Sequence, residues 1–187
     1  HIYAVNPDLL NTLPRRSKFM SYSSVFSTAH LVCLPEKRDG ILRVVHAPSN
    51  RAVKGTTFIL DAINLLKEEG WKIELMLVEK MTNTEALAIY HDSDVIIDQL
   101  LAGWYGAFAV EAMAMGKPVI CYIRSDDLAH IPKQMAEEIP IVNSAPDQIT
   151  DTLRVLSSTG TPAKLYRPLD FLVVTDHAEN MGLPVAL

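Results

Sequence analysis

The chain has 187 residues, enough for one sizeable domain, and 49% of them are hydrophobic, so a well-formed core is expected. A formal net charge of -5 argues against a dedicated nucleic-acid binder. The two cysteines are far apart in sequence and give no disulfide framework, which predicts a reducing, cytoplasmic location. No apolar run reaches the ~18 residues that a membrane span needs.

The first forty residues carry weak signals of regular structure. Residues 1–5 and 18–23 are typical of short strands, and residues 6–13 of a short helix, whereas residues 27–38 show no clear period. The chain starts at His1 without a methionine or a signal-like segment. We therefore expect it to begin inside a larger protein.

From residue 41 onward, apolar runs alternate with amphipathic segments. Continuous apolar runs indicate strands buried on both faces, and apolar residues at helical spacing indicate helices that cover them. Strands are expected at 41–46, 73–78, 94–98, 119–123 and 139–142, and helices at 56–69, 84–91, 107–115 and 147–157. With right-handed crossovers this pattern predicts an α/β fold, a Rossmann-like doubly wound parallel sheet with helices on both faces.

The loop after the first of these strands, residues 46–56, carries two cations. Arg51 and Lys54 could neutralise a diphosphate, and Gly55 would let the backbone approach it closely. Thr56 is expected to cap a helix whose dipole favours an anion by about 0.3–1 kcal/mol. The alternative is a solvated basic loop followed by an ordinary helix cap.

A second loop leads into the segment 105–118. Gly106 comes just before a short helix, so the amides of Ala107 and Phe108 are free to meet a phosphate. Glu111 lies further along this helix and could accept hydrogen bonds from ribose hydroxyls, worth about 1.5–3 kcal/mol each. The alternative places Glu111 at the surface as a partner of the helix dipole. Gly116 is expected to end the helix.

Both loops resemble a known family. The residues His46-Ala-Pro-Ser…Lys54-Gly-Thr and Tyr105-Gly-Ala-Phe-Ala-Val-Glu111-Ala-Met-Ala-Met-Gly-Lys-Pro-Val resemble the C-terminal, donor-binding domain of GT-B glycosyltransferases, specifically glycosyltransferase family 4. The resemblance covers roughly residues 1–157. It implies a retaining, hexosyltransferase-type enzyme that uses a nucleotide-sugar donor and needs neither a metal nor another cofactor. It also implies that Lys54 binds the donor diphosphate, that Glu111 binds the ribose, and that backbone amides near Gly106 meet phosphate or sugar.

The sequence departs from the family pattern at two site positions. The family has two glutamates eight positions apart, and the earlier one, which contacts the transferred sugar, falls at Gly103. Asp98 and Gln99 could substitute for it in part. The family's phosphate-binding arginine falls at Ser49, so that Arg51 is expected to take over its role. No catalytic residue is assigned from the sequence.

A further departure is the absence of the N-terminal, acceptor-binding domain of the GT-B fold. That missing domain is an expected partner, and peripheral membrane contact is expected to run through it. We therefore expect the isolated chain to bind a donor without useful turnover, since nothing would exclude water from the reacting centre. The alternatives are a GT-B-like sugar-nucleotide epimerase and a non-catalytic binding module.

Residues 158–187 are expected to be an atypical tail and not an independent domain. Residues 171–174 run as a strand into Thr175-Asp176-His177, which resembles one metal-ligand turn of PHP-type metal-dependent hydrolases. The resemblance implies that His177 is a metal ligand and that Asp176 is a ligand or lies beside one. A metal centre needs about three or four protein ligands, so no metal is expected. We interpret the chain as a junction of two unrelated gene fragments near residues 157–160.

Overall fold

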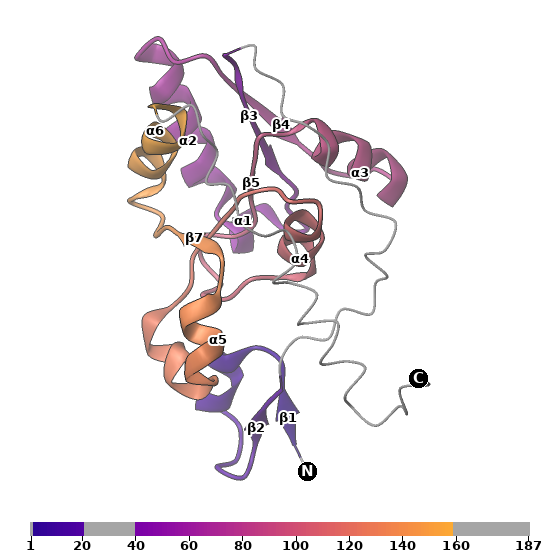
Figure 1. Cartoon of the computed structure of the whole chain (residues 1–187), viewed down its shortest axis with the longest axis vertical. Helices are drawn as coiled ribbons and strands as arrows, with labels where there is room; N and C mark the ends of the chain where they lie inside the picture. The colour runs from indigo at the N-terminus through magenta and orange to yellow at the C-terminus, as the bar shows by residue number, and fades with distance from the viewer. Residues whose placement is uncertain (1, 21–39, 159–187) are drawn as a thin grey trace.

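The structure, a computed structural model, describes residues 2–20 and 40–158. Its centre is a sheet of five parallel strands in the order β4-β3-β5-β6-β7 (Figure 1). These strands are β3 (Leu42–His46), β4 (Ile73–Leu77), β5 (Val95–Ile97), β6 (Val119–Cys121) and β7 (Ile141–Asn143). Every apolar run predicted from residue 41 onward forms a strand of this sheet, so the Rossmann-like doubly wound fold is confirmed.

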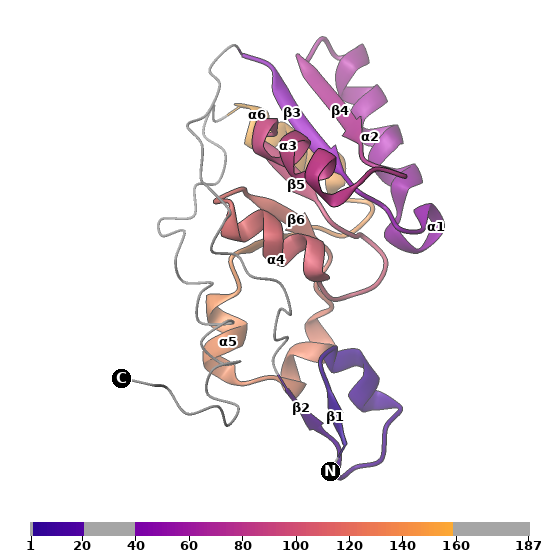
Figure 2. The same cartoon turned by 90° about the vertical axis from the view of Figure 1, so that its right-hand side faces the viewer.

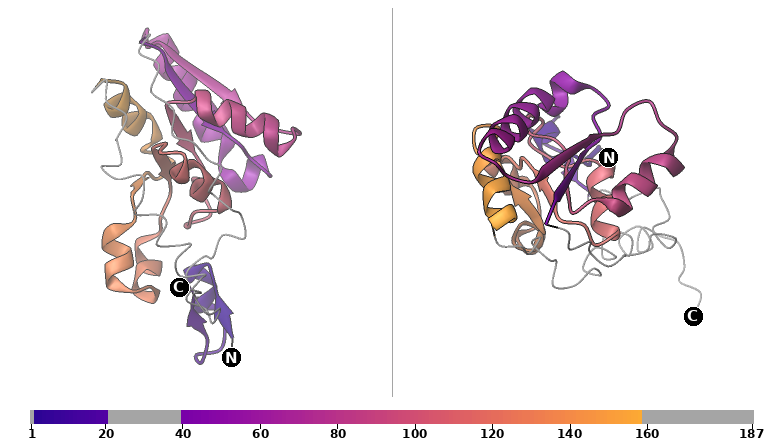
Figure 3. Two further views of the ribbon diagram at one scale, coloured as in Figure 1. Left: turned by 45° about the vertical axis from the view of Figure 1, so that its right-hand side comes forward. Right: turned by 90° about the horizontal axis from the view of Figure 1, so that it is seen from above.

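Helices cover both faces of the sheet, as the view from above in Figure 3 shows. Alternate residues of a strand point to opposite faces, and Val44 therefore packs in one core cluster while Val45 packs in the other. Most of the predicted inward residues of the helices are buried, for example Ile59 and Leu153, both fully, but Phe58, also predicted to face inward, is exposed. One layer holds α2 (Thr56–Glu68) and α6 (Ile149–Ser158), and the other holds α3 (Asn83–Asp92) and α4 (Ala107–Ala114).

The ends of α3 and α4 are fixed by capping contacts, one of which comes from a residue far along the chain. A capping box between Thr82 and Glu85 begins α3. The buried ammonium of Lys117 donates to the carbonyls of His91 and Ser93 at 2.8 and 2.6 Å, and so satisfies the C-terminal end of α3. Gly116, at φ +71°, follows the last turn of α4 and ends it as predicted. The Gly-Lys-Pro part of the 105–118 segment therefore serves packing.

A smaller unit lies on the side of the sheet toward which the carboxyl ends of the strands point (Figures 1 and 2). Its first elements, near the predicted positions, are β1 (Tyr3–Ala4), η1 (Pro7–Asn11) and β2 (Lys18–Phe19), and β1 pairs in parallel with β2. Against η1 packs η2 (Ser125–His130), and α5 (Lys133–Glu138) packs against η2; the sequence pattern predicted neither helix. Helix α5 has six residues and none of them is fully buried, so its sequence carries no apolar stripe that could have predicted it.

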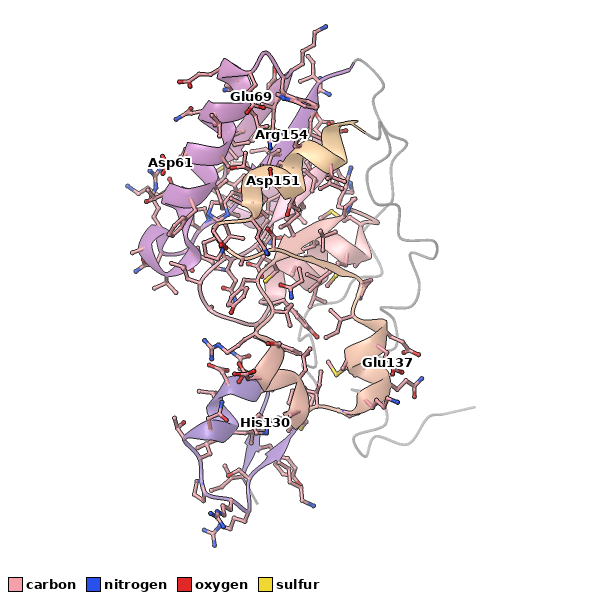
Figure 4. All side chains as sticks on the ribbon, turned by 90° about the vertical axis from the view of Figure 1, so that its left-hand side faces the viewer. Asp61, Glu69, His130, Glu137, Asp151 and Arg154 are labelled. Atoms are coloured by element: carbon pink, nitrogen blue, oxygen red, sulfur yellow. The ribbon has the colours of Figure 1, made fainter. Side chains whose placement is uncertain are left out.

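The last described helix packs on the sheet through its apolar face and is tied to α2 by charge. Arg154 on α6 pairs with Glu69, at the end of α2, at 2.6 Å and also with Asp151, as the side chains labelled in Figure 4 show. Among the helices of residues 2–20 and 40–158, none is long and apolar enough to cross a membrane. The segment from residue 159 on, with the predicted strand 171–174, lies outside the described residues.

Candidate anion-binding site at the carboxyl ends of the strands

The strand order changes direction between β3 and β5. From β3 the chain moves to β4 on one side, and then crosses to β5 on the other side of β3. In open α/β sheets, ligands bind outside the carboxyl ends of the strands at such a switch point. Lys54, from the loop after β3, and Asp98, directly after β5, meet there with 2.5 Å between Nζ and Oδ1.

The loop after β3 contains a helical turn where the sequence predicted an irregular polar loop. Asn50 accepts hydrogen bonds from the amides of Ala52 and Val53, and so begins the four-residue helix α1 (Arg51–Lys54). Gly55, at φ +76°, then ends α1 and begins α2. A Cβ at residue 55 would lie 3.2 Å from the Leu100 side chain, so both the backbone and the space favour glycine.

Thr56 does not cap α2, and that prediction is wrong. Its hydroxyl instead pairs with His46 Nε2 at 2.9 Å, while His46 Nδ1 pairs with the carbonyl of Ile97 at 2.8 Å. Because a carbonyl only accepts, Nδ1 carries the proton and Nε2 accepts from the threonine. Burial lowers the pKa of His46, which keeps the ring neutral. The ring thus ties the turn that carries Lys54 to strand β5.

Asp98 joins the two candidate loops. One carboxylate oxygen pairs with Lys54 Nζ at 2.5 Å, and the other accepts from the Gly106 amide at 2.7 Å. Asp98 is fully buried, whereas the Lys54 side chain is 12% exposed. Gln99, the other proposed substitute for a glutamate, donates its side-chain amide to the Trp104 carbonyl.

The beginning of α4 presents backbone donors beside this pair. Gly106 is the N-cap and has an extended backbone, with no side chain bonded to the helix end. The amides of Ala107 and Phe108 lie in the first turn, where no carbonyl of the helix itself is available to them. The predicted phosphate-binding amides therefore lie directly after a residue that contacts Asp98.

Glu111 lies on the side of α4 that faces α3. Burial and then the nearby Glu111 carboxylate raise the pKa of Tyr90 to about 12. The Phe108 ring packs against the same tyrosine with centroids 4.9 Å apart. Glu111 is half-buried, and its role at the ribose stays a prediction.

Arg51 and Ser49 lie further out. Arg51 makes two hydrogen bonds to Glu79, at 2.9 and 2.5 Å, which raise the pKa of Arg51. Ser49 is exposed. The structure thus brings together Lys54, Gly55 and Gly106, whereas Arg51 is engaged with a carboxylate at the end of β4.

Gly103 takes the position of the family's earlier glutamate, and an arginine fills the space beside it. Its φ is +76°, and a Cβ there would lie 3.2 Å from the Cβ, Cζ and Nη2 atoms of Arg124. The Arg124 amide also donates to the Gly103 carbonyl at 2.9 Å. Sequence reasoning missed Arg124, although its place directly after an apolar run, at the carboxyl end of β6, is a usable signal.

The rings of Trp104 and Tyr105 anchor the loop that leads to α4. They stack with centroids 4.8 Å apart and are almost fully buried. Burial raises the pKa of Tyr105 to about 12, so its hydroxyl stays protonated at neutral pH and does not act as a base.

Metal-binding groups do not gather in the part of the chain that the structure describes. There, no three His, Cys, Asp or Glu side chains come close enough to hold one ion. Asp176 and His177 lie outside the described residues. The expectation that no metal is needed stays a prediction.

Comparisons by sequence and by structure give different results. No curated protein matches the chain significantly. A family model described as a protein of unknown function (DUF3604) matches residues 150–187. Among solved structures, the chain is similar to the C-terminal domain of a glycosyl transferase group 1 family protein (LpcC) from Francisella tularensis, with 16% identity and a TM-score of 0.54. That match covers 81% of this chain and 98% of the other.

Two longer structures match in the same way. The catalytic domain of starch synthase IV from Arabidopsis thaliana, solved with ADP and acarbose, has 13% identity and a TM-score of 0.50, covering 94% of this chain and 47% of that one. TarM has 10% identity and a TM-score of 0.51, covering 93% of this chain and 38% of that one. At such identities the likeness concerns the fold. The chain thus has the fold of the Rossmann-like C-terminal domain of GT-B glycosyltransferases and spans less than half the length of these two neighbours.

Proposed function

We propose that this chain is the donor-binding domain of a retaining glycosyltransferase and that it binds the diphosphate of a nucleotide sugar at the switch point. One observation carries the proposal: Lys54 Nζ and the Gly106 amide both reach Asp98, so the two loops meet between β3 and β5. An ammonium has three donors, and Asp98 uses one of them. The remaining donors, with the amides of Ala107 and Phe108, suit the oxygens of a diphosphate.

The other site residues have subordinate roles in this proposal. Gly55 supplies the left-handed backbone of the turn after Lys54 and has no side chain there, so that a ligand can approach the backbone closely. Glu111 receives the ribose hydroxyls, and Arg51 with Ser49 lies at the outer edge, where Arg51 contributes once it leaves Glu79. No metal takes part in donor binding in this scheme.

Calorimetric titration with UDP, GDP and ADP tests the proposal, and ADP belongs in the set because one structural neighbour was solved with it. Lys54→Met is expected to weaken binding of the preferred diphosphate ~10–100-fold, the worth of a hydrogen bond to a charged group. Lys67→Met, on the exposed side of α2, is the matched control. Equal affinity in the two variants, or no binding of any diphosphate to the wild type, contradicts the proposal.

Glu111→Ala separates the ribose from the diphosphate. This variant is expected to weaken the nucleoside diphosphate and to leave inorganic pyrophosphate unchanged, whereas Lys54→Met weakens both. If Glu111→Ala lost the same affinity for the nucleoside diphosphate as for pyrophosphate, the assignment of Glu111 to the ribose would be contradicted.

Turnover is a separate part of the proposal. In the GT-B arrangement the acceptor binds to a second domain, and two structural neighbours are more than twice as long as the segment they share with this chain. We propose that a hexosyl donor binds here and that the chain alone does not transfer or hydrolyse it at a useful rate. Release of nucleoside diphosphate from a nucleotide hexose by the chain alone would contradict this.

A second candidate function follows from the Gly103 turn. The Arg124 side chain lies beside residue 103, where the family has a carboxylate that contacts the transferred sugar. This difference favours, as the second candidate, a sugar-nucleotide epimerase or a non-catalytic binding module. NMR of a nucleotide sugar incubated with the chain distinguishes these functions, because an epimerase yields a second sugar signal and a binding module leaves the spectrum unchanged.

A further inference from the structure

We propose that Arg124 is a second anion-binding residue of this site, and that it binds an oxyanion of the donor, either a phosphate or the carboxylate of an acidic sugar, above the Gly103 turn. This proposal rests on the function proposed above, since it assigns a further group to the same ligand. Arg124 lies outside both loops that carry the family resemblance.

The position of Arg124 follows from two adjacent parallel strands. Gly103 is in the loop after β5, and Arg124 follows β6, which is paired with β5. The Arg124 amide donates to the Gly103 carbonyl at 2.9 Å, and the arginine side chain then folds over the glycine. With φ +76° and a Cβ position only 3.2 Å from the Arg124 side chain, residue 103 is best suited to glycine when the guanidinium lies there.

The guanidinium is held from one side and accessible from the other. Nη1 pairs at 3.2 Å with Asp127, whose carboxylate is 1% exposed and also accepts from Asn11 at 3.0 Å. Asn11 in turn pairs with His130, labelled in Figure 4, at 2.9 Å. The buried Asp127 carboxylate, itself held by the exposed Asn11, thus fixes the direction of Arg124.

The open side of Arg124 presents donors of the right geometry. Within residues 2–20 and 40–158, Asp127 supplies the hydrogen bond to this guanidinium, and Nε and Nη2 make none. The side chain is 41% exposed. Two N–H groups on a planar guanidinium match two oxygens of a phosphate or carboxylate better than a lysine does.

Arg124 and Lys54 flank the same short loop. The Lys54 ammonium lies 3.8 Å from where a Cβ of Gly106 would be, and Arg124 lies 3.2 Å from where a Cβ of Gly103 would be. Two residues, Trp104 and Tyr105, lie between the two glycines, so three Cα–Cα steps place the glycine Cα atoms at most ~11 Å apart. One donor with a diphosphate and a further polar group can therefore contact both cations and the start of α4.

Arg51 is a weaker candidate for this role. Both of its hydrogen bonds go to the two oxygens of Glu79, so its fork is already occupied. Arg124 donates to Asp127 through Nη1 alone, and its Nε and Nη2 make no hydrogen bond to any of the described residues. The geometry therefore favours Arg124 over the arginine that the sequence suggested.

Calorimetry on the full chain tests Arg124 with four ligands: the preferred nucleoside diphosphate, its hexose conjugate, its hexuronate conjugate and the bare nucleoside. Arg124→Met is compared with Arg154→Met, which removes an arginine from α6. The expected result is a ~10–100-fold loss for the ligands whose oxyanion Arg124 holds and no change for the nucleoside. An equal loss for all three diphosphates assigns a phosphate, and a loss confined to the hexuronate assigns the sugar carboxylate.

The same titrations can overturn the proposal. If Arg124→Met binds every diphosphate within ~2-fold of Arg154→Met while Lys54→Met is weakened, the Arg124 site is wrong and the donor site stands. If the nucleoside is weakened as much as the diphosphates, Arg124 is structural. If the wild type binds no diphosphate, both proposals fail together. If Arg124→Met does not fold, Arg124→Lys replaces it in the same comparison with Arg154→Met. Lysine keeps a positive charge for Asp127 but lacks the paired N–H groups of the guanidinium.

Discussion

Replacing Asp98 with asparagine removes a negative charge from a fully buried position and keeps the size of the side chain. Asparagine retains an oxygen for the Gly106 amide, now 2.7 Å from the carboxylate, but it cannot balance the Lys54 ammonium at 2.5 Å. Removing one partner of a buried ion pair costs about 3–5 kcal/mol. Because Lys54 is 12% exposed and can turn toward water, we expect the lower end, about 3 kcal/mol.

Urea unfolding followed by tryptophan fluorescence measures this loss, since Trp104 lies buried near the site. The midpoint should fall while the slope stays the same. Asp61→Asn, an exposed position on α2 labelled in Figure 4, is the control and should change the free energy of unfolding by less than about 0.5 kcal/mol.

A double variant shows whether the loss runs through Lys54. When Lys54→Met is already present, Asp98→Asn should cost less than it does alone, by at least about 1 kcal/mol, because the ion pair can be lost only once. A cost below about 1 kcal/mol for Asp98→Asn alone, or full additivity of the two changes, would refute the view that this pair joins the loops.

Two further predictions concern the backbone and the buried ring of the site. Gly103→Ala and Gly40→Ala share φ +76°, but only residue 103 has Arg124 in the way, so Gly103→Ala should be less stable than Gly40→Ala by about 1 kcal/mol in urea unfolding. Equal losses of stability in the two variants would contradict the view that Arg124 restricts the space at residue 103. The burial of His46 lowers its folded pKa below the ~6.5 of an unfolded chain, so the unfolded state binds more protons and stability falls as pH drops below ~6.5. His46→Asn should flatten this pH dependence in unfolding curves between pH 5 and pH 7.5, and an unchanged slope would contradict the assignment.

The strands and the four helices of the two layers were predictable because their signal lies in nearby residues. A strand buried on both faces reads as an apolar run, as in residues 119–123, and a helix on one face repeats its apolar residues at helical spacing. The ends of these elements differ from the predicted ones by at most two residues.

The elements and contacts that were missed depend on distant partners. Helix α1 is too short to show a period, and α5 has no fully buried residue. Lys54 was identified from its loop, but its pairing with Asp98 requires the order of the strands to be known. The contact of Arg124 with Gly103 likewise joins two loops on neighbouring strands and leaves no local pattern.

The ion pair between Lys54 and Asp98 also links the two helix layers mechanically. Lys54 belongs to the loop that begins α2, in one layer, while Gly106 begins α4, in the other. Both contact the carboxylate of Asp98 at the edge of the sheet. A slide of one layer along the sheet would therefore change the separation of Lys54 Nζ and the Gly106 amide directly. If the proposed donor binds between them, core substitutions far from the ligand, in either layer, are expected to alter its affinity without touching any atom that contacts it.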